Sequence, residues 1–428
     1  MRYPDSVRQS GRVPAPVASP IPLTWDQVRG HRLRRHGLSG PLASGSIVRA
    51  AGTVCGIHGQ VASAAALSLA RRVRDAPLSA LSDGLADRSL VKTYGPRGTV
   101  HVFPSQELTL WTAATRAMPD RGSRQPALAT SEAKLTAEQS EQLRAAVRAV
   151  TTGTQFTRNE LGEAITAECG PWADAVASPA WNTGWSHWRL AVDEAVARGE
   201  LCFGAPQGNR VTFVRTDEWL AETVTQEWTK PDGTMIGTAP AVLVEVARHY
   251  LGAYGPATHQ EFAQWFALPA GLGRQVYAAL SDELIAVDVE GTRSWALRDS
   301  EPDTWQPVEK CLRLLGYFDC FAVGCHPRDE LAPPAAAEQA RAHARGFAKG
   351  SARRFLCGPL PVLLIDGVVC GVWTYRREGA ADQVRVEVFG PGSAAPRKLL
   401  AAEVARLAAL TDRDLELSVG PADIAAHL

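Results

Sequence analysis

A repeated pattern of helices followed by a hairpin constrains the fold of this 428-residue chain more than any other feature. Residues 157–160 (Thr-Arg-Asn-Glu) and 258–261 (Thr-His-Gln-Glu) are both capping boxes, which begin a helix because the threonine and the glutamate satisfy free backbone amides. In each copy a second helix follows, and then two strands around a glycine turn, at 201–214 and 284–297. This order is typical of winged helix-turn-helix domains.

A more divergent copy of the same pattern lies near the N-terminus. Residues 24–27 (Thr-Trp-Asp-Gln) form another capping box, and residues 90–103 form a hairpin that turns over Gly-Pro-Arg-Gly. Between them the spacing of apolar residues predicts helices at 46–53, 60–73 and 76–86. Stretches with proline and glycine at 117–136 and 229–240 are the expected linkers between the copies.

From about residue 310 the pattern changes to strands. Residues 361–365 and 368–375 flank Asp366-Gly367, a dipeptide typical of a tight hairpin turn, and residues 384–388 alternate as a half-buried strand. A helix is expected at 395–409, and a loop with one exposed helix at 327–354.

These patterns predict an α+β protein of three tandem winged helix-turn-helix domains followed by a small β-barrel-like domain. The expected boundaries are a disordered tail with five prolines (1–22), three winged-helix units (23–125, 137–228 and 238–300) and a β-rich C-terminal domain (310–428).

The charges are distributed unevenly, although the formal net charge is zero. Residues 1–125 contain 17 Lys and Arg against 7 Asp and Glu, whereas the rest of the chain has an acidic excess. A basic segment favours a polyanionic partner, although a coding bias toward arginine and alanine would produce the same composition. Three winged helices also favour DNA, but such domains serve as protein-interaction modules too, and the later two copies are acidic.

Composition argues against a membrane protein and against a disulfide scaffold. No apolar run approaches the roughly 18 residues of a membrane span, and the first 22 residues lack the apolar stretch of a secretory signal. Eight cysteines are too sparse to form a disulfide framework in a chain of this length. We therefore expect a cytoplasmic protein with reduced thiols and no membrane partner.

The common signatures of metal and cofactor sites are absent from the sequence. There is no phosphate-binding loop, no His-Glu-x-x-His, no Cys-x-x-Cys pair and no glycine-rich dinucleotide turn. Cys320, Cys325 and His326 cluster, but they lack a fourth ligand at zinc-site spacing. We expect buried thiols there, with no metal and no cofactor.

The segment Cys55–Gln60 (Cys-Gly-Ile-His-Gly-Gln) stands out within the basic part of the chain. In an extended backbone His58 and Gln60, two residues apart, face the same side and can reach into one cavity. The spacing also fits a structural role, in which His58 is a helix cap or a satisfied core group and Gln60 is the first exposed residue of the next helix.

Over about residues 22–420 the chain resembles the winged-helix DNA glycosylases typified by AlkZ and YcaQ. The resemblance rests on residues 23–29, on the Gly-Ile-His-Gly-Gln segment, on residues 94–101 and 314–319, and on the hairpin with Asp366-Gly367 and residues 371–373. Members of this family have three tandem winged helices and a C-terminal β-barrel around a concave DNA-binding channel. The resemblance therefore implies a C-shaped molecule, and a monomeric clamp is the default expectation.

The resemblance makes His58 and Gln60 the expected catalytic residues. The AlkZ-like branch of the family carries Gln or His, one residue, and then Gln, and this chain has the histidine variant. Gly59 departs from the apolar middle residue that is usual in the family, and it gives the backbone more freedom. An alkylated guanine is a cationic leaving group, so positioning one water at C1′ is the main requirement. Gln60 is expected to hold that water, and His58 to orient it or accept its proton.

Other matched positions are expected to bind DNA. Arg97, Thr99 and His101 belong to the first hairpin, beside the expected site; a hairpin turn with a buried histidine is an equally good interpretation of them. Arg376 and Arg377 follow the Trp373 strand, where a solvated strand end is the alternative. The first lysine after the motif is Lys92, and this distance favours a monofunctional, hydrolytic glycosylase without a Schiff-base intermediate.

The expected function is thus base excision repair of double-stranded DNA that carries alkylated purines. The expected lesions are bulky N7-alkylpurine adducts or interstrand crosslinks from genotoxic natural products, which would make the protein a self-resistance enzyme. The alternative from another class is a non-catalytic transcriptional regulator built of tandem winged helices, and a third is an interaction scaffold.

Overall fold

The computed structural model describes most of the chain, and every structural statement below concerns those residues. They are residues 19–118, 135–178, 184–208, 210–220, 228–229, 235–236, 241–343, 356–378, 381–390 and 396–424. The predicted tail (1–22) lies outside them except for its last four residues, and so do most of the linkers predicted at 117–136 and 229–240. The part of the second linker that is described contains two short paired strands, β10 (Trp228–Thr229) and β11 (Met235–Ile236).

The first unit combines short helices with the predicted hairpin. Its helices are α2 (Ile47–Thr53), α3 (Ala62–Ala70), α4 (Ala80–Ala86) and α5 (Leu108–Arg116). Its strands are β2 (Ile57–His58), β3 (Leu90–Tyr94) and β4 (Val100–Pro104). Because β2 adds to the outer side of β4, the His58 segment lies at the edge of the sheet, which runs β2-β4-β3 in this unit and continues into the second unit to give six strands.

The second unit confirms the capping box and the hairpin predicted for this stretch. Its elements are α6 (Ala137–Val150), β5 (Phe156–Thr157), α7 (Arg158–Cys169), α8 (His187–Arg198), β8 (Leu201–Phe203) and β9 (Thr212–Arg215). The Thr157 hydroxyl accepts from the Glu160 amide while the Glu160 carboxylate accepts from the Thr157 amide. Inside α7 the buried Leu161 and Ile165 form the predicted apolar face.

The third unit repeats this arrangement, and its first helix has 14 residues, as in the second unit. It comprises α10 (Ala241–Tyr254), α11 (His259–Phe266), α12 (Ala270–Ala279), β12 (Leu284–Val289) and β13 (Thr292–Leu297). Thr258 and Glu261 form the second predicted capping box, and the predicted apolar positions Phe262 and Phe266 are fully buried.

The start of the chain packs on the third unit, not on the first unit with which we grouped it. Strand β1 (Ile21–Leu23) pairs in parallel with β12, and helix α1 (Trp25–Arg35) follows it. Trp25 and Val28 are buried in one small cluster with Val287 and Val289 of β12. The predicted capping box at Thr24 is present. The apolar side of the helix that it begins packs on the third unit, so a first unit that starts at residue 23 does not match this packing. The pairing of β1 also places residues 21–22 in a strand and not in the tail.

The C-terminal part is a five-stranded half-barrel with one covering helix. The strand order is β14 (Leu312–Leu315), β15 (Val362–Ile365), β16 (Val368–Glu378), β17 (Ala381–Val388) and β18 (Leu415–Val419), and the helix is α17 (Arg397–Thr411). Asp366 and Gly367 both have positive φ, as the predicted tight turn requires. Among the described strands β14 and β18 do not pair with each other, so the sheet stays open where a barrel would close.

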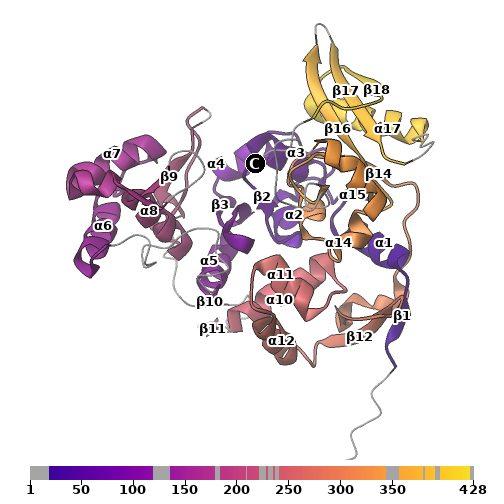
Figure 1. The fold of residues 1–428 in the computed structure, drawn as a ribbon, viewed down its shortest axis with the longest axis horizontal. Coiled ribbons are helices and arrows are strands. Elements are labelled where there is room, and N and C mark those ends of the chain that lie inside the picture. Colours follow the sequence, from indigo (N-terminus) through magenta and orange to yellow (C-terminus); the bar gives the residue numbers. More distant parts are fainter. Residues whose placement is uncertain are drawn as a thin grey trace, which may run out of the picture.

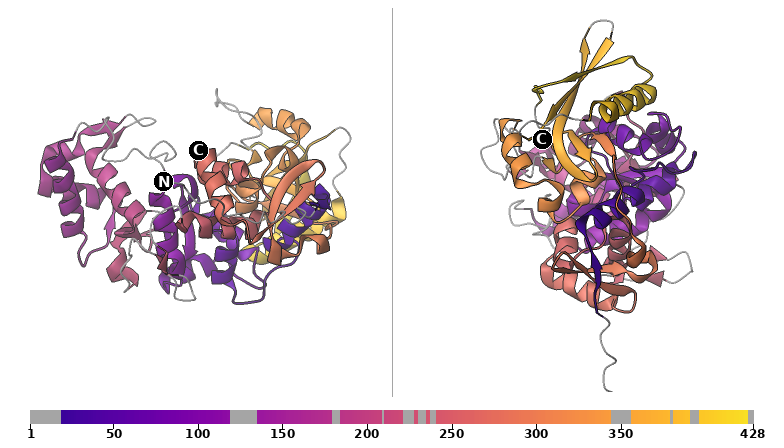
Figure 2. Two further views of the ribbon diagram at one scale, coloured as in Figure 1. Left: turned by 90° about the horizontal axis from the view of Figure 1, so that it is seen from below. Right: turned by 90° about the vertical axis from the view of Figure 1, so that its right-hand side faces the viewer.

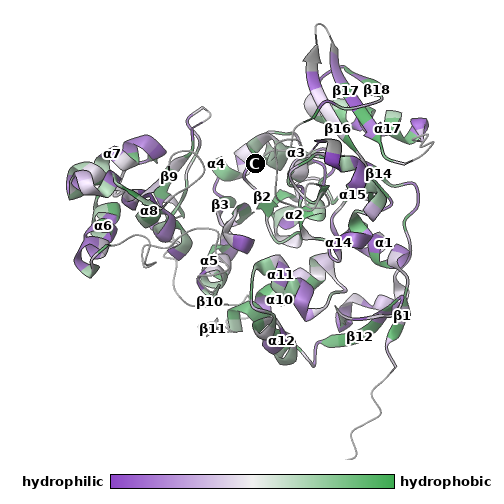
Figure 3. Cartoon of the chain, in the orientation of Figure 1, coloured by the Kyte–Doolittle hydropathy of each residue, from purple (hydrophilic) through white to green (hydrophobic). Residues whose placement is uncertain are grey.

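The units are arranged along one direction. Figure 1 shows the second unit at one end, the first unit in the middle, and the third unit and the half-barrel at the other end; the left view of Figure 2 shows the same order from below. The second unit has a hydrophobic core of its own, whereas the first, third and C-terminal parts share one that includes Phe103, Trp111, Tyr250 and Phe321. In Figure 3 hydrophilic and hydrophobic residues alternate along the outer helices α6 and α7, as expected for helices with one buried face. No helix among the described residues is long and apolar enough to cross a membrane.

Two buried ion pairs attach α3 and the residues after it to the C-terminal part. The Arg72 guanidinium donates to both oxygens of Asp319, at 2.7 and 2.9 Å, and both side chains are almost completely buried. Arg71 donates to Glu403 of α17, which is equally buried. The arginine beside Asp319 and the hydrogen bonds that its carboxylate accepts hold the pKa of Asp319 below its ordinary value, although burial opposes this shift.

We predict that Arg72→Met destabilises the protein strongly. The substitution leaves the Asp319 carboxylate buried without its partner, which costs about 3–5 kcal/mol in the free energy of unfolding. Urea denaturation measures this change, and Arg74→Met is the matched control, because Arg74 is exposed two residues further on. Equal stabilities of the two variants would contradict the prediction.

Candidate functional site

The backbone before His58 makes a left-handed turn that places strand β2. Cys55 and Gly56 both have positive φ, 60° and 89°. A Cβ at position 56 would lie 2.3 Å from a ring carbon of Phe103, so only glycine fits there. The strand then pairs with β4, with His58 directly opposite His101. The amide of Gly59 donates to the Val100 carbonyl at 2.8 Å, so the segment is held despite the flexibility of glycine.

His58 is buried beside a very small cavity. Its side chain is stacked on Phe318, with ring centroids 4.9 Å apart and an interplanar angle of 14°, and the ring of His101 lies 4.9 Å away. The cavity holds about 10 Å³, roughly the space for one water. Its walls are mainly aromatic rings, thiols and backbone, with one guanidinium: Cys55, Gly56, His58, Arg97, His101, Tyr254, Trp265, Cys320, Val323 and Gly324. His58 therefore points inward, but into a partly polar cavity and not into aliphatic packing.

Gln60 lies at the solvent end of the same short segment. It is exposed, and α3 begins two residues later. Strand β2 ends at His58 and the backbone bends at Gln60, and the described lining of the His58 cavity does not include Gln60. The structure thus brings a buried imidazole and an exposed carboxamide to the two ends of one stretch of three residues.

His101 is a neutral partner beside His58. Burial, together with the charge of Arg97, lowers the pKa of His101 to about 3. Its Nδ1 lies 2.8 Å from the Thr99 carbonyl, and since a carbonyl only accepts, Nδ1 carries the proton and Nε2 is left as an acceptor. His101 is buried, as expected from the alternative interpretation of this segment as a hairpin turn with a buried histidine.

The other predicted DNA-binding residues differ in their surroundings. Arg97, half-buried at the hairpin turn, donates from Nη1 to the Trp265 carbonyl of α11 at 2.6 Å, and the Thr99 hydroxyl donates to Pro96 O at 2.9 Å. Arg97 thus fixes the turn against the third unit, and Thr99 stabilises the turn itself. Arg376 is exposed on β16 and pairs with Asp423 at 2.6 Å. Arg377 follows it in β16, and its side chain lies outside the described part of the structure.

Lys92 is much closer to the motif than its sequence distance suggests. A Cβ on Gly59 would lie 3.5 Å from the Cε of Lys92, because only strand β4 lies between β2 and the Lys92 strand β3. The sequence distance between Lys92 and the motif is therefore not an argument against a lysine near the site. The register places Lys92 and Ile57 opposite Val102 on one face of the sheet, and His58 opposite His101 on the other face. Lys92 lies over the ring of Phe203, and burial together with the charge of Arg158 lowers its pKa.

Phe318 and Asp319 are functional neighbours to which the sequence analysis gave no role. The Asp319 carboxylate accepts from the Phe321 amide and so caps helix α13 (Cys320–Gly324), while its other bonds to Arg72 and Ser68 hold it against α3. The preceding residue, Phe318, is thereby placed on the ring of His58. The available signal was an aspartate at the start of a short helix, a typical N-cap.

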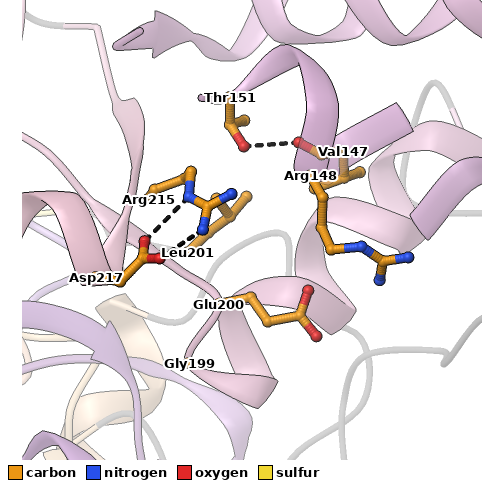
Figure 4. Close-up of a pocket in the computed structure, with 8 residues that line it drawn as sticks. All are labelled: Val147, Arg148, Thr151, Gly199, Glu200, Leu201, Arg215 and Asp217. Carbon is orange, nitrogen blue, oxygen red and sulfur yellow. Dashed lines mark hydrogen bonds and ion pairs between the residues drawn. The ribbon is translucent and has the colours of Figure 1, made fainter. Parts of the chain in front are cut away.

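A second cavity, in the second unit, offers no such groups. Figure 4 shows its lining around Thr151, Glu200 and Arg215. The guanidinium of Arg215 pairs with Asp217 at 2.5 Å, and the Thr151 hydroxyl donates to the Val147 carbonyl. These groups stabilise the unit and lie on elements other than those that carry His58.

Comparison with known proteins identifies the family. Residues 51–410 match the model of the family described as DNA glycosylase AlkZ-like. The chain belongs to the AlkZ-like DNA glycosylase family. It is 29% identical over 393 residues to the interstrand DNA cross-link repair glycosylase of Streptomyces sahachiroi, which covers 90% of this chain and 96% of that relative. The solved structure of the S. sahachiroi DNA glycosylase AlkZ superposes with a TM-score of 0.71 at 25% identity, over 94% of this chain and all of that one.

Membership of this AlkZ-like family confirms that the chain is a DNA glycosylase, as the resemblance implied, and an α+β protein with a half-barrel sheet. A non-catalytic regulator is not favoured by these relatives.

We predict that His101 makes the protein less stable in mild acid. With a native pKa of about 3 against an ordinary value near 6.5, the unfolded chain takes up the proton first, so this contribution is complete above pH 6.5 and declines below it. Between pH 7.5 and 5.5 the loss amounts to about 1.4 kcal/mol in the free energy of unfolding. Urea denaturation at both pH values tests this, and the loss should be smaller in His101→Gln, which cannot titrate. The same loss in both proteins would rule the effect out.

Proposed function

We propose that this protein hydrolyses the N-glycosidic bond of bulky N7-alkylpurine adducts or interstrand crosslinks in double-stranded DNA, as a self-resistance repair enzyme against genotoxic natural products. The observation that carries the proposal is the water-sized cavity beside His58, with Gln60 exposed at the other end of the same segment. The similarity to the interstrand DNA cross-link repair glycosylase of S. sahachiroi supports crosslinks as one class of lesion.

The mechanism relies on positioning more than on strong acids or bases. Alkylation at N7 makes the purine a cationic leaving group, so its departure needs little assistance. The amide of Gln60 holds the attacking water at C1′, and His58, fixed by stacking on Phe318, orients this water or accepts its proton. Neutral His101 stands beside His58 and adds no positive charge there at neutral pH.

The proposal includes an arrangement on DNA. The three helix-and-hairpin units act as tandem winged helices, and with the half-barrel they form a C-shaped monomeric clamp around a concave channel. Arg97 and Thr99, at the hairpin turn, contact the duplex next to the scissile bond, with the buried His101 behind them, and Arg376 and Arg377 contact it from the β16 strand. The reaction takes place in the cytoplasm, where the eight cysteines stay reduced.

We expect Gln60→Ala to lose most base release, because the side chain that holds the water is removed. The assay incubates a duplex that contains N7-methylguanine or a natural-product adduct, cleaves abasic sites, and compares single-turnover rates. A loss of about 100-fold is expected, the lower scale for a positioned catalytic group. Gln142→Ala, an exposed glutamine on α6, is the control and should react like the parent.

The outcomes separate the two candidate functions. If the parent releases no base from any alkylated duplex and binds one particular sequence regardless of damage, the protein is a regulator. If Gln60→Ala releases the base at the rate of the parent, the assignment of the catalytic residue is wrong while the function stands.

We further expect a monofunctional reaction, since Lys92 lies on the sheet face opposite His58. Borohydride added during turnover should trap no protein–DNA adduct, and the product should be an intact abasic site. Gel electrophoresis in denaturant detects both. A trapped adduct that disappears in Lys92→Arg would establish a Schiff base at this lysine and overturn the expectation.

A further inference from the structure

Three basic side chains gather where the first and second units meet. Lys92 lies in β3 at the position that pairs with Phe203 of β8, so it stands at the junction of the two units. Arg158 begins α7 and Arg189 belongs to α8, and all three side chains are half-buried. Burial and then the charge of Arg158 lower the pKa of both Lys92 and Arg189, so Arg158 is close enough to repel the other two. We call these three residues the basic junction.

The carboxylates near the basic junction do not neutralise it. Among the described residues neither Lys92 nor Arg158 forms an ion pair, and Arg189 approaches Asp193 only to 4.0 Å. Asp193 is itself buried and accepts from the Tyr94 hydroxyl at 2.6 Å, and burial raises its pKa. A half-buried group of like charges is unfavourable unless an anion binds to it, so this surface calls for an anionic partner.

Two of the three cations lie against aromatic rings. The Nζ of Lys92 is 5.3 Å from the ring centroid of Phe203, and the guanidinium carbon of Arg189 is 4.7 Å from that of Trp185. A ring holds a cation in place and leaves its N–H groups available to an anion. A planar guanidinium matches the oxygens of a phosphate, and an ammonium adds a point charge, so the set suits a phosphodiester.

The basic junction adjoins the segment that carries His58 and Gln60. A Cβ on Gly59 would lie 3.5 Å from the Cε of Lys92, so the lysine stem covers the middle residue of this segment. His58 lies on the other face of the sheet, but β2 is the edge strand, and Gln60 is exposed beyond its end. DNA that passes along this edge can therefore place a phosphate at Lys92 and the sugar of the same nucleotide at Gln60.

We propose that the basic junction binds one backbone phosphate of the damaged strand, next to the lesion, and thereby positions the deoxyribose at Gln60. The inference rests on the proposed glycosylase function and adds three positioning residues to it, none of which touches the reacting atoms. Because Lys92 belongs to the first unit and the two arginines belong to the second, the bound phosphate also connects the two units.

The experiment neutralises single phosphates of the DNA. Each duplex of a series carries tetrahydrofuran, a stable abasic analogue, at the lesion position and one uncharged methylphosphonate at a different position of the damaged strand. Fluorescence anisotropy gives the Kd of each duplex for the parent, for Lys92→Met, for Arg158→Gln and for the double variant. Methionine keeps the stem of Lys92 and removes its charge. The matched control is Lys398→Met, which removes an exposed charge on α17, at the end of the molecule opposite the second unit (Figure 1).

We expect one methylphosphonate next to the lesion to weaken binding of the parent and of Lys398→Met about tenfold, the scale of one hydrogen bond to a charged group. The loss should shrink to about threefold in Lys92→Met and in Arg158→Gln, and to less than about twofold in the double variant, because the partners of that phosphate are gone.

A tenfold loss that persists in all three variants would overturn the basic junction, as would a parent that is insensitive to every methylphosphonate. Base release from N7-methylguanine by the parent is measured in parallel. Coupling to one phosphate without base release would refute the proposed function and leave the basic junction standing, whereas base release without coupling would refute the basic junction alone.

Discussion

The contact between Arg72 and Asp319 connects the two halves of the candidate site. Arg72 lies two residues after the end of α3, and Asp319 lies between the residue stacked on His58 and the short helix α13. One bidentate ion pair therefore fixes the distance between the segment with His58 and Gln60 and the loop with Phe318. A buried pair of this kind adds little net stability compared with apolar packing, but it penalises every arrangement in which one partner moves away. Such a constraint suits a site whose chemistry depends on the position of a single water.

The same contact explains why the site lies between units and not within one. His58 belongs to a strand of the first unit, Trp265 to the third, and Phe318 and Cys320 to the beginning of the C-terminal part. The common hydrophobic core of these three parts gives them one rigid frame. The core of the second unit consists mainly of its own residues, with Tyr94 of the first unit added. The two units also join through the pairing of Lys92 with Phe203 and through the hydrogen bonds from Tyr94 to Asp193 and from Arg116 to the Arg198 carbonyl.

Local signals in the sequence were sufficient for the repeated elements. The capping boxes at Thr24, Thr157 and Thr258 begin helices, and the Asp-Gly turn joins two strands, because each depends only on residues a few positions apart. Contacts across hundreds of residues left no such signal. The pairing of β1 with β12, the open edge of the half-barrel and the approach of Lys92 to Gly59 depend on tertiary packing. For the site, the sequence singled out His58 and Gln60, whereas the ring that holds His58 in place became visible only in three dimensions.

The pairing of β1 with β12 closes the path of the chain. Residues near the beginning are joined to the third unit by this pairing, by Arg35, which donates to the Gly252 carbonyl, and by Arg32, which donates to Pro256 O. A protease that cleaves the backbone between the second and third units would therefore not release two separate fragments, since the amino-terminal fragment stays bound to the third unit through β1 and α1. Deleting residues beyond position 20, by contrast, would remove the edge strand β1 from the sheet of the third unit. An affinity tag should therefore be added before β1 and should not replace it.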